Sequence, residues 1–225
     1  MAARDIQIAI DGPAASGKST VARLVARKLG GCYINTGDMY RTVTWMAQAA
    51  GVNPATDPAG VVRQLATLDL QVRRDAGGQP VLFLNDRLVA QDSIRAPDVA
   101  AAVSYVARIP EVRNWLLERQ RATCRLGIIV MEGRDIGTVV FPAARFKFFV
   151  TASPDVRARR RLAQGGETVS GATVASVAAE IAERDRLDST RAVAPLRAAP
   201  DAVTISTDDL TAEQVADRIV AVVRG

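Results

Sequence analysis

A glycine-rich segment near the start of the chain carries the clearest chemical signal. A hydrophobic run at residues 6–10 precedes it, and a helical pattern follows it as far as Leu29. This strand, loop and helix order is the context that a phosphate-binding loop requires. The segment fits the pattern G-x-x-x-x-G-K-[ST] and consists of Gly12, Pro13, Ala14, Ala15, Ser16, Gly17, Lys18, Ser19 and Thr20.

The parts of this segment have separate physical tasks. Its glycines allow backbone N–H groups to turn towards phosphate oxygens, and the dipole of the following helix favours negative charge there. Lys18 is expected to reach the β and γ phosphates, and the Ser19 hydroxyl is expected to ligate Mg²⁺. We therefore expect ATP with Mg²⁺ as the ligand.

Phosphate-binding loops serve motors, switches and kinases, so other segments must decide between these classes. The chain contains no Asn-Lys-x-Asp guanine signature, which weakens a GTPase switch. Residues 35–41, 132–138 and 184–191 each combine arginine with hydroxyl or carboxylate side chains. Arginine is well suited to bidentate phosphate binding. These segments favour a kinase over a regulatory module that holds ATP without transferring phosphate.

The composition excludes several other functions. Histidine is absent, which excludes histidine-based triads, general bases and zinc sites. Cys32 and Cys124 lie far apart and match no metal or disulfide pattern. The net charge is +5, but aromatic residues make up only 4%, so nucleic-acid binding is not expected. No long apolar run indicates a membrane span or a signal peptide, and we expect a cytoplasmic protein.

Short β-branched runs alternate with longer helical segments. The runs at residues 6–10, 32–34, 128–131, 146–150 and 203–206 predict buried strands. Their alternation with helices predicts an α/β fold with a parallel five-stranded sheet. Residues 68–89 contain turns at Gly77-Gly78 and Asn85-Asp86 and predict a small antiparallel insertion. With 225 residues, we expect one hydrophobic core.

A helix predicted after Pro154 carries four arginines. Arg157, Arg160 and Arg161 share one face of it, and Arg159 points elsewhere. The three could converge on ATP phosphates, or they could form a solvated basic face. Residues 164–173 are rich in Gly, Ser and Thr and predict a mobile segment, which would suit a closing lid.

In five motifs the sequence resembles the bacterial cytidylate kinase family of nucleoside monophosphate (NMP) kinases. The motifs are IDGPAASGKST, TGDMYR, SYVARIPEVR, EGRDIGTVVFP and RDRLDSTRAVAPL, in the family order and at family-like spacing. The resemblance implies ATP-dependent phosphorylation of CMP and dCMP to CDP and dCDP in pyrimidine metabolism, by a monomer. A kinase for another small acceptor, such as UMP, AMP or shikimate, is the nearest alternative.

The resemblance also implies how the chain is divided. A P-loop core would comprise residues 1–62 and 96–225, with a short lid at about residues 157–180. Residues 63–95 would form the NMP-binding insertion.

Site residues follow from the resemblance position by position. A carboxylate at Asp135 would accept a hydrogen bond from the cytosine amino group but would face a carbonyl oxygen of uracil, so it would reject UMP. Without the family resemblance these residues have other interpretations. Ser104 and Arg113, which are predicted on one helix, would be surface residues. Asp135 would form a local ion pair with Arg134, and Arg41 would cap a helix end. The implied binding residues are Thr36, Arg41 and Arg134 for the monophosphate, Ser104, Arg113 and Asp135 for the cytosine, and Arg184 and Asp188 for the ribose. The candidate catalytic residues are Lys18, Arg157, Arg161, Arg184 and Arg191.

Carboxylates near the loop complete the prediction. Glu132 ends a hydrophobic run and is, with Ser19, a candidate Mg²⁺ ligand. Asp11 could instead act on the metal indirectly, and the sequence does not rank the two carboxylates. The family pattern has aspartate and alanine where this chain has Asn35 and Asp38. We hypothesise that any electrostatic role of the family aspartate is absent here or has shifted to Asp38.

Overall fold

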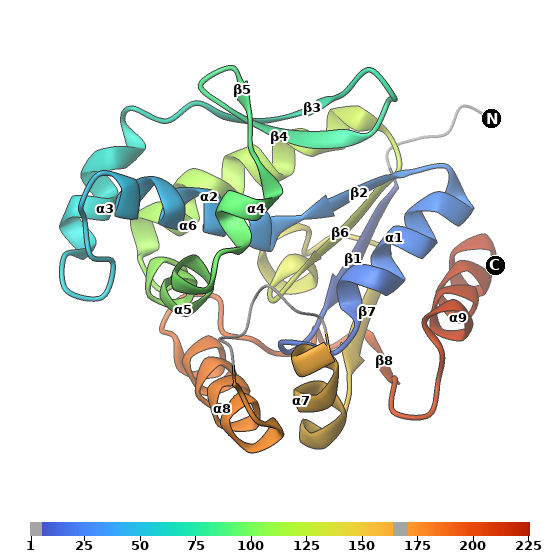
Figure 1. The fold of residues 1–225 in the computed structure, drawn as a ribbon. Helices are drawn as coiled ribbons and strands as arrows, with labels where there is room; N and C mark the ends of the chain where they lie inside the picture. The colour runs from blue at the N-terminus through green and yellow to red at the C-terminus, as the bar shows by residue number, and fades with distance from the viewer. Residues whose placement is uncertain (1–5, 164–170) are drawn as a thin grey trace.

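The computed structural model describes residues 6–163 and 171–225. Its centre is a parallel sheet with the strand order β2-β6-β1-β7-β8 (Figure 1). The predicted five-stranded parallel sheet is therefore confirmed. The strands are β1 (Gln7–Asp11), β2 (Cys32–Asn35), β6 (Ile129–Gly133), β7 (Phe146–Thr151) and β8 (Val203–Ser206).

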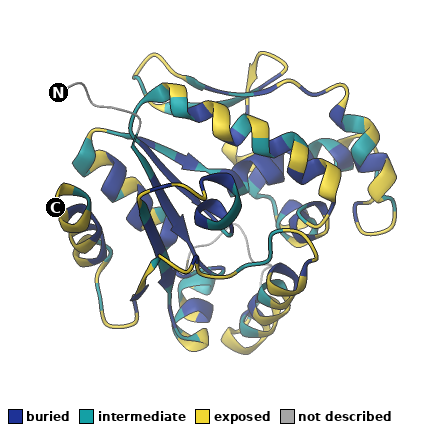
Figure 2. Cartoon of the chain, turned by 180° about the vertical axis from the view of Figure 1, so that it is seen from behind, coloured by how far each residue is buried: buried dark blue, intermediate teal, exposed yellow. Residues whose placement is uncertain are grey.

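Helices cover both faces of this sheet, whose strands are largely buried (Figure 2). Ile8 and Ile10 of β1 pack in a cluster with side chains of α1 (Lys18–Leu29) and α9 (Ala212–Arg224). Ala9 lies in the cluster on the opposite face, because successive side chains of a strand point to opposite sides. The helices of that face include α2 (Thr36–Ala49), α3 (Pro58–Leu65) and α6 (Pro110–Arg121).

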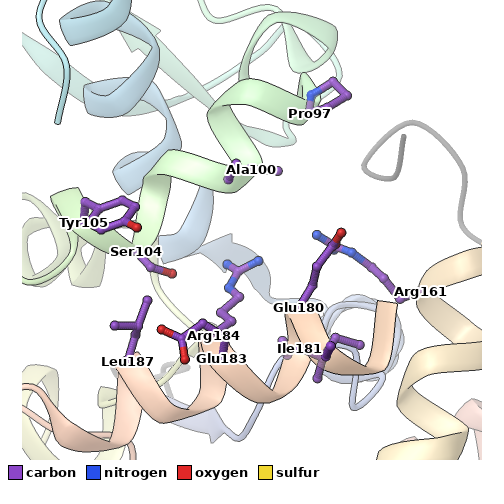
Figure 3. A pocket seen from close by; sticks show the side chains of 13 residues that line it. Pro97, Ala100, Ser104, Tyr105, Arg161, Glu180, Ile181, Glu183, Arg184 and Leu187 are labelled. Atoms are coloured by element: carbon purple, nitrogen blue, oxygen red, sulfur yellow. The ribbon is translucent and has the colours of Figure 1, made fainter. Parts of the chain in front are cut away.

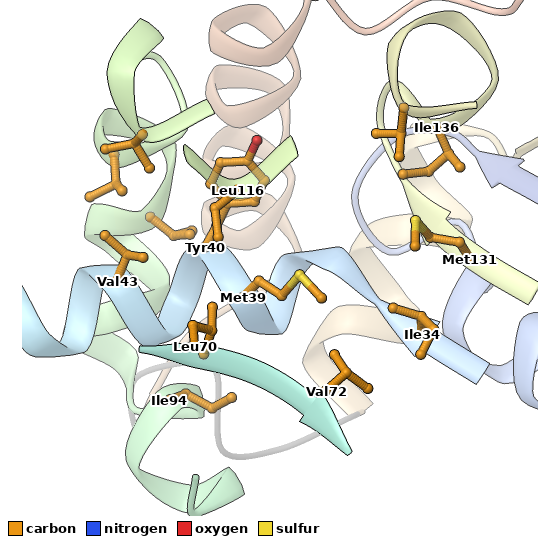
Figure 4. Close-up of a cluster of buried hydrophobic side chains, with 14 of the residues drawn as sticks. Ile34, Met39, Tyr40, Val43, Leu70, Val72, Ile94, Leu116, Met131 and Ile136 are labelled. Carbon is orange, nitrogen blue, oxygen red and sulfur yellow. The ribbon is translucent and has the colours of Figure 1, made fainter. Parts of the chain in front are cut away.

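The expectation of one core needs correction, because the sheet separates two large apolar clusters. A third, small cluster contains Ala14, Ala158, Val177 and Ile181. The largest cluster reaches from the sheet, through Ile34 and Met131, to the far side of α2 (Figure 4).

The predicted antiparallel insertion is also confirmed as a three-stranded sheet in the order β3-β4-β5. Asn85 and Asp86 both have positive φ, +48° and +61°, as a tight hairpin turn requires. Leu70 and Val72 belong to the same apolar cluster as Met39 of α2, so the insertion is anchored on the core. Its strands are β3 (Leu70–Arg74), β4 (Pro80–Leu84) and β5 (Arg87–Leu88).

Ser104 and Arg113 do not share one helix, contrary to the sequence prediction. Ser104 lies on α5 (Pro97–Val106), and Arg113 lies on α6. Between them Ile109 is extended, with φ −75° and ψ 116°, and Pro110 starts the next helix. Proline lacks an N–H and disfavours the helical region for the residue before it, so one continuous helix cannot form.

The remaining helices connect the elements already described. The capping box of α8, formed by Thr173 and Ser176, orders the end of the segment predicted to be mobile, and residues 164–170 lie outside the described residues. Among the described helices, none is long and apolar enough to span a membrane. These elements are α4 (Gln91–Arg95), the 3₁₀ helix η1 (Ala122–Leu126), the π-helix η2 (Ile136–Val140), α7 (Pro154–Ala163) and α8 (Val174–Thr190).

Candidate active site

The loop between β1 and α1 depends on two of its glycines. Gly12 has a φ of +148°, and a Cβ atom there would lie 2.0 Å from the carbonyl oxygen of Val150 on β7. Gly17 has a φ of +88° and directly precedes Lys18, the first residue of α1. Both positions therefore favour glycine. The loop lies at the helix N-terminus, where backbone N–H groups and the helix dipole attract anions.

Lys18 is buried under this loop. Its Nζ donates hydrogen bonds to the carbonyl oxygen of Pro13 at 2.5 Å and to Ser16 Oγ at 3.3 Å. Burial, together with the positive charges of Arg134 and Arg184, lowers the pKa of Lys18 to about 7. A phosphate anion beside Nζ would favour the charged form, so the site is electrostatically prepared for a polyanion.

A cavity of about 440 Å³ opens between the loop, α2, α5, α8 and the ends of β2 and β6. Strand ends of a parallel sheet meet at one edge, and ligands bind there in open α/β folds. Arg113 and Arg157 are not among its described lining residues, nor are Gly12 and Pro13. The predicted site residues that do line it are Ala14, Ala15, Ser16, Gly17, Lys18, Ser19, Thr20, Thr36, Arg41, Ser104, Glu132, Arg134, Asp135, Arg161, Arg184, Asp188 and Arg191.

Asp135, which lines the cavity, forms ion pairs with two guanidinium groups. Arg113 Nη2 donates a hydrogen bond to Asp135 Oδ2, and both side chains are buried. Arg191 Nη2 lies 3.7 Å from Asp135 Oδ1. Ser104 is buried and lines the same cavity, so the three predicted base-contacting residues gather although they come from separate elements. They combine a carboxylate acceptor, a hydroxyl and a guanidinium donor.

Three further arginines, Arg41, Arg134 and Arg184, line the same cavity and are buried or half-buried. Arg134 Nε donates to Asp188 Oδ2 at 2.9 Å, and Arg41 Nη1 donates to the carbonyl oxygen of Ile94 at 3.3 Å. Burial alone would raise the pKa of Asp188, but its arginine neighbours hold it below its ordinary value. Burial and the charge of Arg134 lower the pKa of Arg184. Such concentrated positive charge favours the binding of phosphate in this cavity.

Two predicted ligands could hold Mg²⁺ beside bound phosphates. Ser19 and Glu132 line the cavity and offer hydroxyl and carboxylate oxygens, which this cation prefers. Tyr33 Oη donates a hydrogen bond to Glu132 Oε1 and so orients that carboxylate. Within residues 6–163 and 171–225, no group of three His, Cys, Asp or Glu side chains could hold a metal. This fits Mg²⁺, which is often bound by one or two side chains and substrate phosphates.

Asp11 is hydrogen-bonded to the backbone that directly follows Asp135. Its Oδ1 and Oδ2 accept hydrogen bonds from the backbone N–H groups of Ile136 and Gly137, both at 2.8 Å. These residues begin η2 and directly follow Asp135. Burial raises the pKa of Asp11 to about 6 against the effect of these two hydrogen bonds. Asp11 therefore fixes the backbone that presents Arg134 and Asp135.

The arginines of α7 do not converge on one point. Arg161 lines the cavity, but Arg157 donates to Asp185 Oδ2, and Arg160 donates to Thr207 Oγ1 and to the Thr207 carbonyl oxygen, both at 2.7 Å. Arg159 is exposed, as its position on the helix predicted. One face of α7 thus contacts three different partners.

The two residues that depart from the family pattern have separate partners. Asn35 Oδ1 accepts a hydrogen bond from the backbone N of Asp38 at 3.3 Å and caps α2. Asp38 Oδ1 accepts a hydrogen bond from Arg95 Nη2 at 2.7 Å, which links α2 to α4. Arg95 and Arg23 also line the cavity, and sequence reasoning missed both, because neither belongs to a recognisable motif.

A second cavity, of about 520 Å³, adjoins the first between α5 and α8 (Figure 3). It shares Ser104, Arg161 and Arg184 with the first cavity. Much of its remaining lining is apolar, including Leu187 and Ile181. The two cavities together form one cleft with an apolar side, which suits a ligand with both a ring system and phosphates.

Comparisons with known proteins found related sequences and a related fold. The sequence profile of the family described as cytidylate kinase matches residues 8–225. A cytidylate kinase of Pelotomaculum thermopropionicum is 49% identical over 95% of this chain and 94% of that protein. One of Mycobacterium avium is 46% identical over 98% of this chain and 96% of that protein. An uncharacterized protein from Eubacterium ventriosum shares the fold, with a TM-score of 0.53. It is 13% identical in sequence, and the match covers 98% of this chain and 99% of that protein.

Proposed function

The chain belongs to the cytidylate kinase family, and from this membership and the geometry of the cleft we propose that it phosphorylates CMP and dCMP with ATP. The protein is a phosphotransferase by family. One observation supports the specific reaction best: a phosphate-binding loop and Asp135, which forms a buried ion pair with Arg113, line the same cavity together with several arginines. The family gives no support to UMP as the preferred acceptor.

In the proposed donor site the loop backbone and Lys18 hold the ATP phosphates. Ser19 and Glu132 would hold Mg²⁺, which shields phosphate charge when bound. We also propose a monomer that acts in pyrimidine metabolism in the cytoplasm. The division into a core at residues 1–62 and 96–225, with a lid at about residues 157–180 and an NMP-binding insertion at residues 63–95, is part of the same proposal.

The acceptor is a monophosphate oxygen that is largely anionic at neutral pH, so the transfer needs no strong general base. Arg41 and Arg134 are proposed to hold the acceptor phosphate, with Thr36 beside it. Arg184, Arg191 and Arg161 would then neutralise charge on the transferred group. Alignment and charge neutralisation supply most of the catalysis in this kind of reaction. The absence of histidine is compatible with such chemistry.

Base selection is proposed to depend on Asp135. Its carboxylate would accept a hydrogen bond from the cytosine amino group, whereas the uracil carbonyl would place two acceptors together. The ion pairs of Asp135 with Arg113 and Arg191 restrain its carboxylate. Ser104 would supply a further hydrogen bond, and Arg184 and Asp188 would contact the ribose.

A panel assay tests the assignment. ADP release from ATP is measured with CMP, dCMP, UMP, AMP or no acceptor, and CMP and dCMP should give the highest kcat/KM. ADP release that is independent of CMP, or a preference for UMP over CMP, would contradict the proposed function.

A further inference from the structure

The phosphate loop is held at Ala14 by the side chain of Asp185, to which the proposed reaction assigns no substrate contact. Asp185 on α8 accepts, through Oδ1, a hydrogen bond from the backbone N of Ala14 at 3.2 Å. Its Oδ2 accepts a hydrogen bond from Arg157 Nη1 on α7. The same guanidinium nitrogen donates to the carbonyl oxygen of Ala14 at 3.3 Å. One ion pair therefore restrains the peptide groups on both sides of Ala14.

Apolar contacts hold the same point of the loop. Ala14 is buried and packs in a small cluster with Ala158 of α7 and with Val177 and Ile181 of α8. The next residue, Ala15, has a φ of +57°, which is the left-handed region that non-glycine residues seldom adopt. A backbone in this conformation persists only where its surroundings hold it in place.

The charges of the pair explain why a carboxylate is tolerated beside a phosphate-binding loop. An unpaired carboxylate there would repel the ATP phosphates. Arg157 balances this charge, and the side chains are largely shielded from solvent, with exposures of 10% for Arg157 and 20% for Asp185. Arg157 is thereby engaged by Asp185 and the loop, while Arg161 of the same helix lines the cavity.

We propose that Asp185 is a positioning residue for the donor phosphates, and that Arg157 acts through it. By fixing Ala14, the pair keeps the loop amides that follow aligned on the phosphates. This role replaces the direct phosphate contact predicted for Arg157. The inference rests on the proposed function in one respect, namely that ATP is the phosphate donor.

Steady-state kinetics give the first test. Losing a hydrogen bond to a charged group commonly costs about a factor of ten or more. We expect Asp185→Ala to raise the KM for ATP about tenfold and to change the KM for CMP by less than about twofold. Arg157→Ala should act in the same direction, and the double variant should be little worse than the poorer single variant, because both remove one unit.

The control is Asp217→Ala. Like Asp185→Ala, this variant removes a carboxylate that pairs with a cation of another helix, because Asp217 of α9 lies 2.9 Å from Lys28 of α1. Asp217 is not among the residues that line either cavity. This variant should leave both KM values unchanged. If Asp185→Ala does not fold, Asp185→Asn is measured, which keeps an acceptor for Ala14 and should give a smaller rise in the KM for ATP.

Amide hydrogen exchange of the ligand-free protein gives a test that does not depend on turnover. Peptides that cover residues 12–20 should exchange faster in Asp185→Ala than in wild type and should be unchanged in Asp217→Ala. Unchanged exchange, or equal increases in the KM values for ATP and CMP, would overturn the proposal. Faster loop exchange in a protein without CMP kinase activity would support the positioning role and contradict only the proposed function.

Discussion

Asp135 is the residue on which base selection depends in the proposed site. Its replacement by asparagine should narrow the preference for CMP over UMP, because an amide can also donate a hydrogen bond to the uracil carbonyl. A correctly paired base contact contributes about 1–3 kcal/mol of discrimination, so we expect the kcat/KM ratio of CMP to UMP to fall about tenfold or more. Competition kinetics measure this ratio independently of the folded fraction.

The matched variant is Arg134→Ala, which removes a proposed phosphate contact. It should weaken CMP, dCMP and UMP alike and leave the ratio unchanged. An unaltered ratio in Asp135→Asn would show that Asp135 does not select the base.

Asp11 gives a prediction about stability and pH. Because its folded pKa is raised from 3.8 to about 6, the folded protein binds more protons than the unfolded chain between these values. The stabilising contribution of Asp11 to the free energy of unfolding is therefore fully present below pH 3.8 and is lost as the pH rises through about 6. Asp11→Asn, which cannot ionise, should gain melting temperature relative to wild type across this window. A difference in Tm that is constant with pH would contradict the assigned cause, which is burial.

Single residues also show how far the sequence could be interpreted. The loop from Gly12 to Thr20 could be recognised because its chemistry requires fixed residue types at fixed spacing. Asp185 could not be recognised as a loop contact, because it meets Ala14 from 171 positions away and only the packing of α8 on the loop joins them. For the same reason the sequence could not show that Arg157 contacts Asp185 and the loop.

At the scale of elements, α2 and α4 are joined by Asp38 and Arg95. The ion pair lies at the cavity, close to the proposed phosphate contacts, and burial raises the pKa of Asp38 although Arg95 opposes this. Asp38→Ala should release α4 and lower kcat/KM for CMP about three- to tenfold, a moderate effect because Arg95 is partly exposed. Arg95→Ala should reproduce this effect, and the double variant should add little. Unchanged kinetics in Asp38→Ala would contradict the hypothesis that the electrostatic role of the family aspartate has shifted to Asp38.

Strands were easier to predict than the limits of helices. Four of the five runs form strands of buried or half-buried residues, so their hydrophobic pattern is nearly continuous. The fifth, β8, lies at the edge of the sheet and buries only Ile205, contrary to the predicted buried strand. The break between α5 and α6 was missed although Pro110 marks it, since the apolar residues on both sides suggested one long helix. That break matters for the site, because it allows Ser104 and Arg113 to approach Asp135 from two helices.

At the scale of the whole molecule, alternating strands and helices predicted the parallel sheet but not the distribution of its core. Which helix covers which face depends on connections between distant segments, such as α1 with α9. The anchoring of the insertion through Leu70 and Val72 likewise depends on tertiary packing. The local sequence pattern does not contain this information.

The half-buried cations of the cavity lead to a prediction for global stability. Burial and the charge of Arg134 lower the pKa of Arg184 in the ligand-free protein, and an anionic ligand would oppose this effect. A ligand at about 100 times its Kd stabilises the folded state by about 2.7 kcal/mol, which corresponds to about 5–10 °C in Tm for a chain of this size. CMP at such a concentration should therefore raise the Tm measured by scanning calorimetry, and UMP at the same concentration should raise it much less. Equal shifts with both nucleotides would mean that the cleft recognises the phosphate without selecting the base.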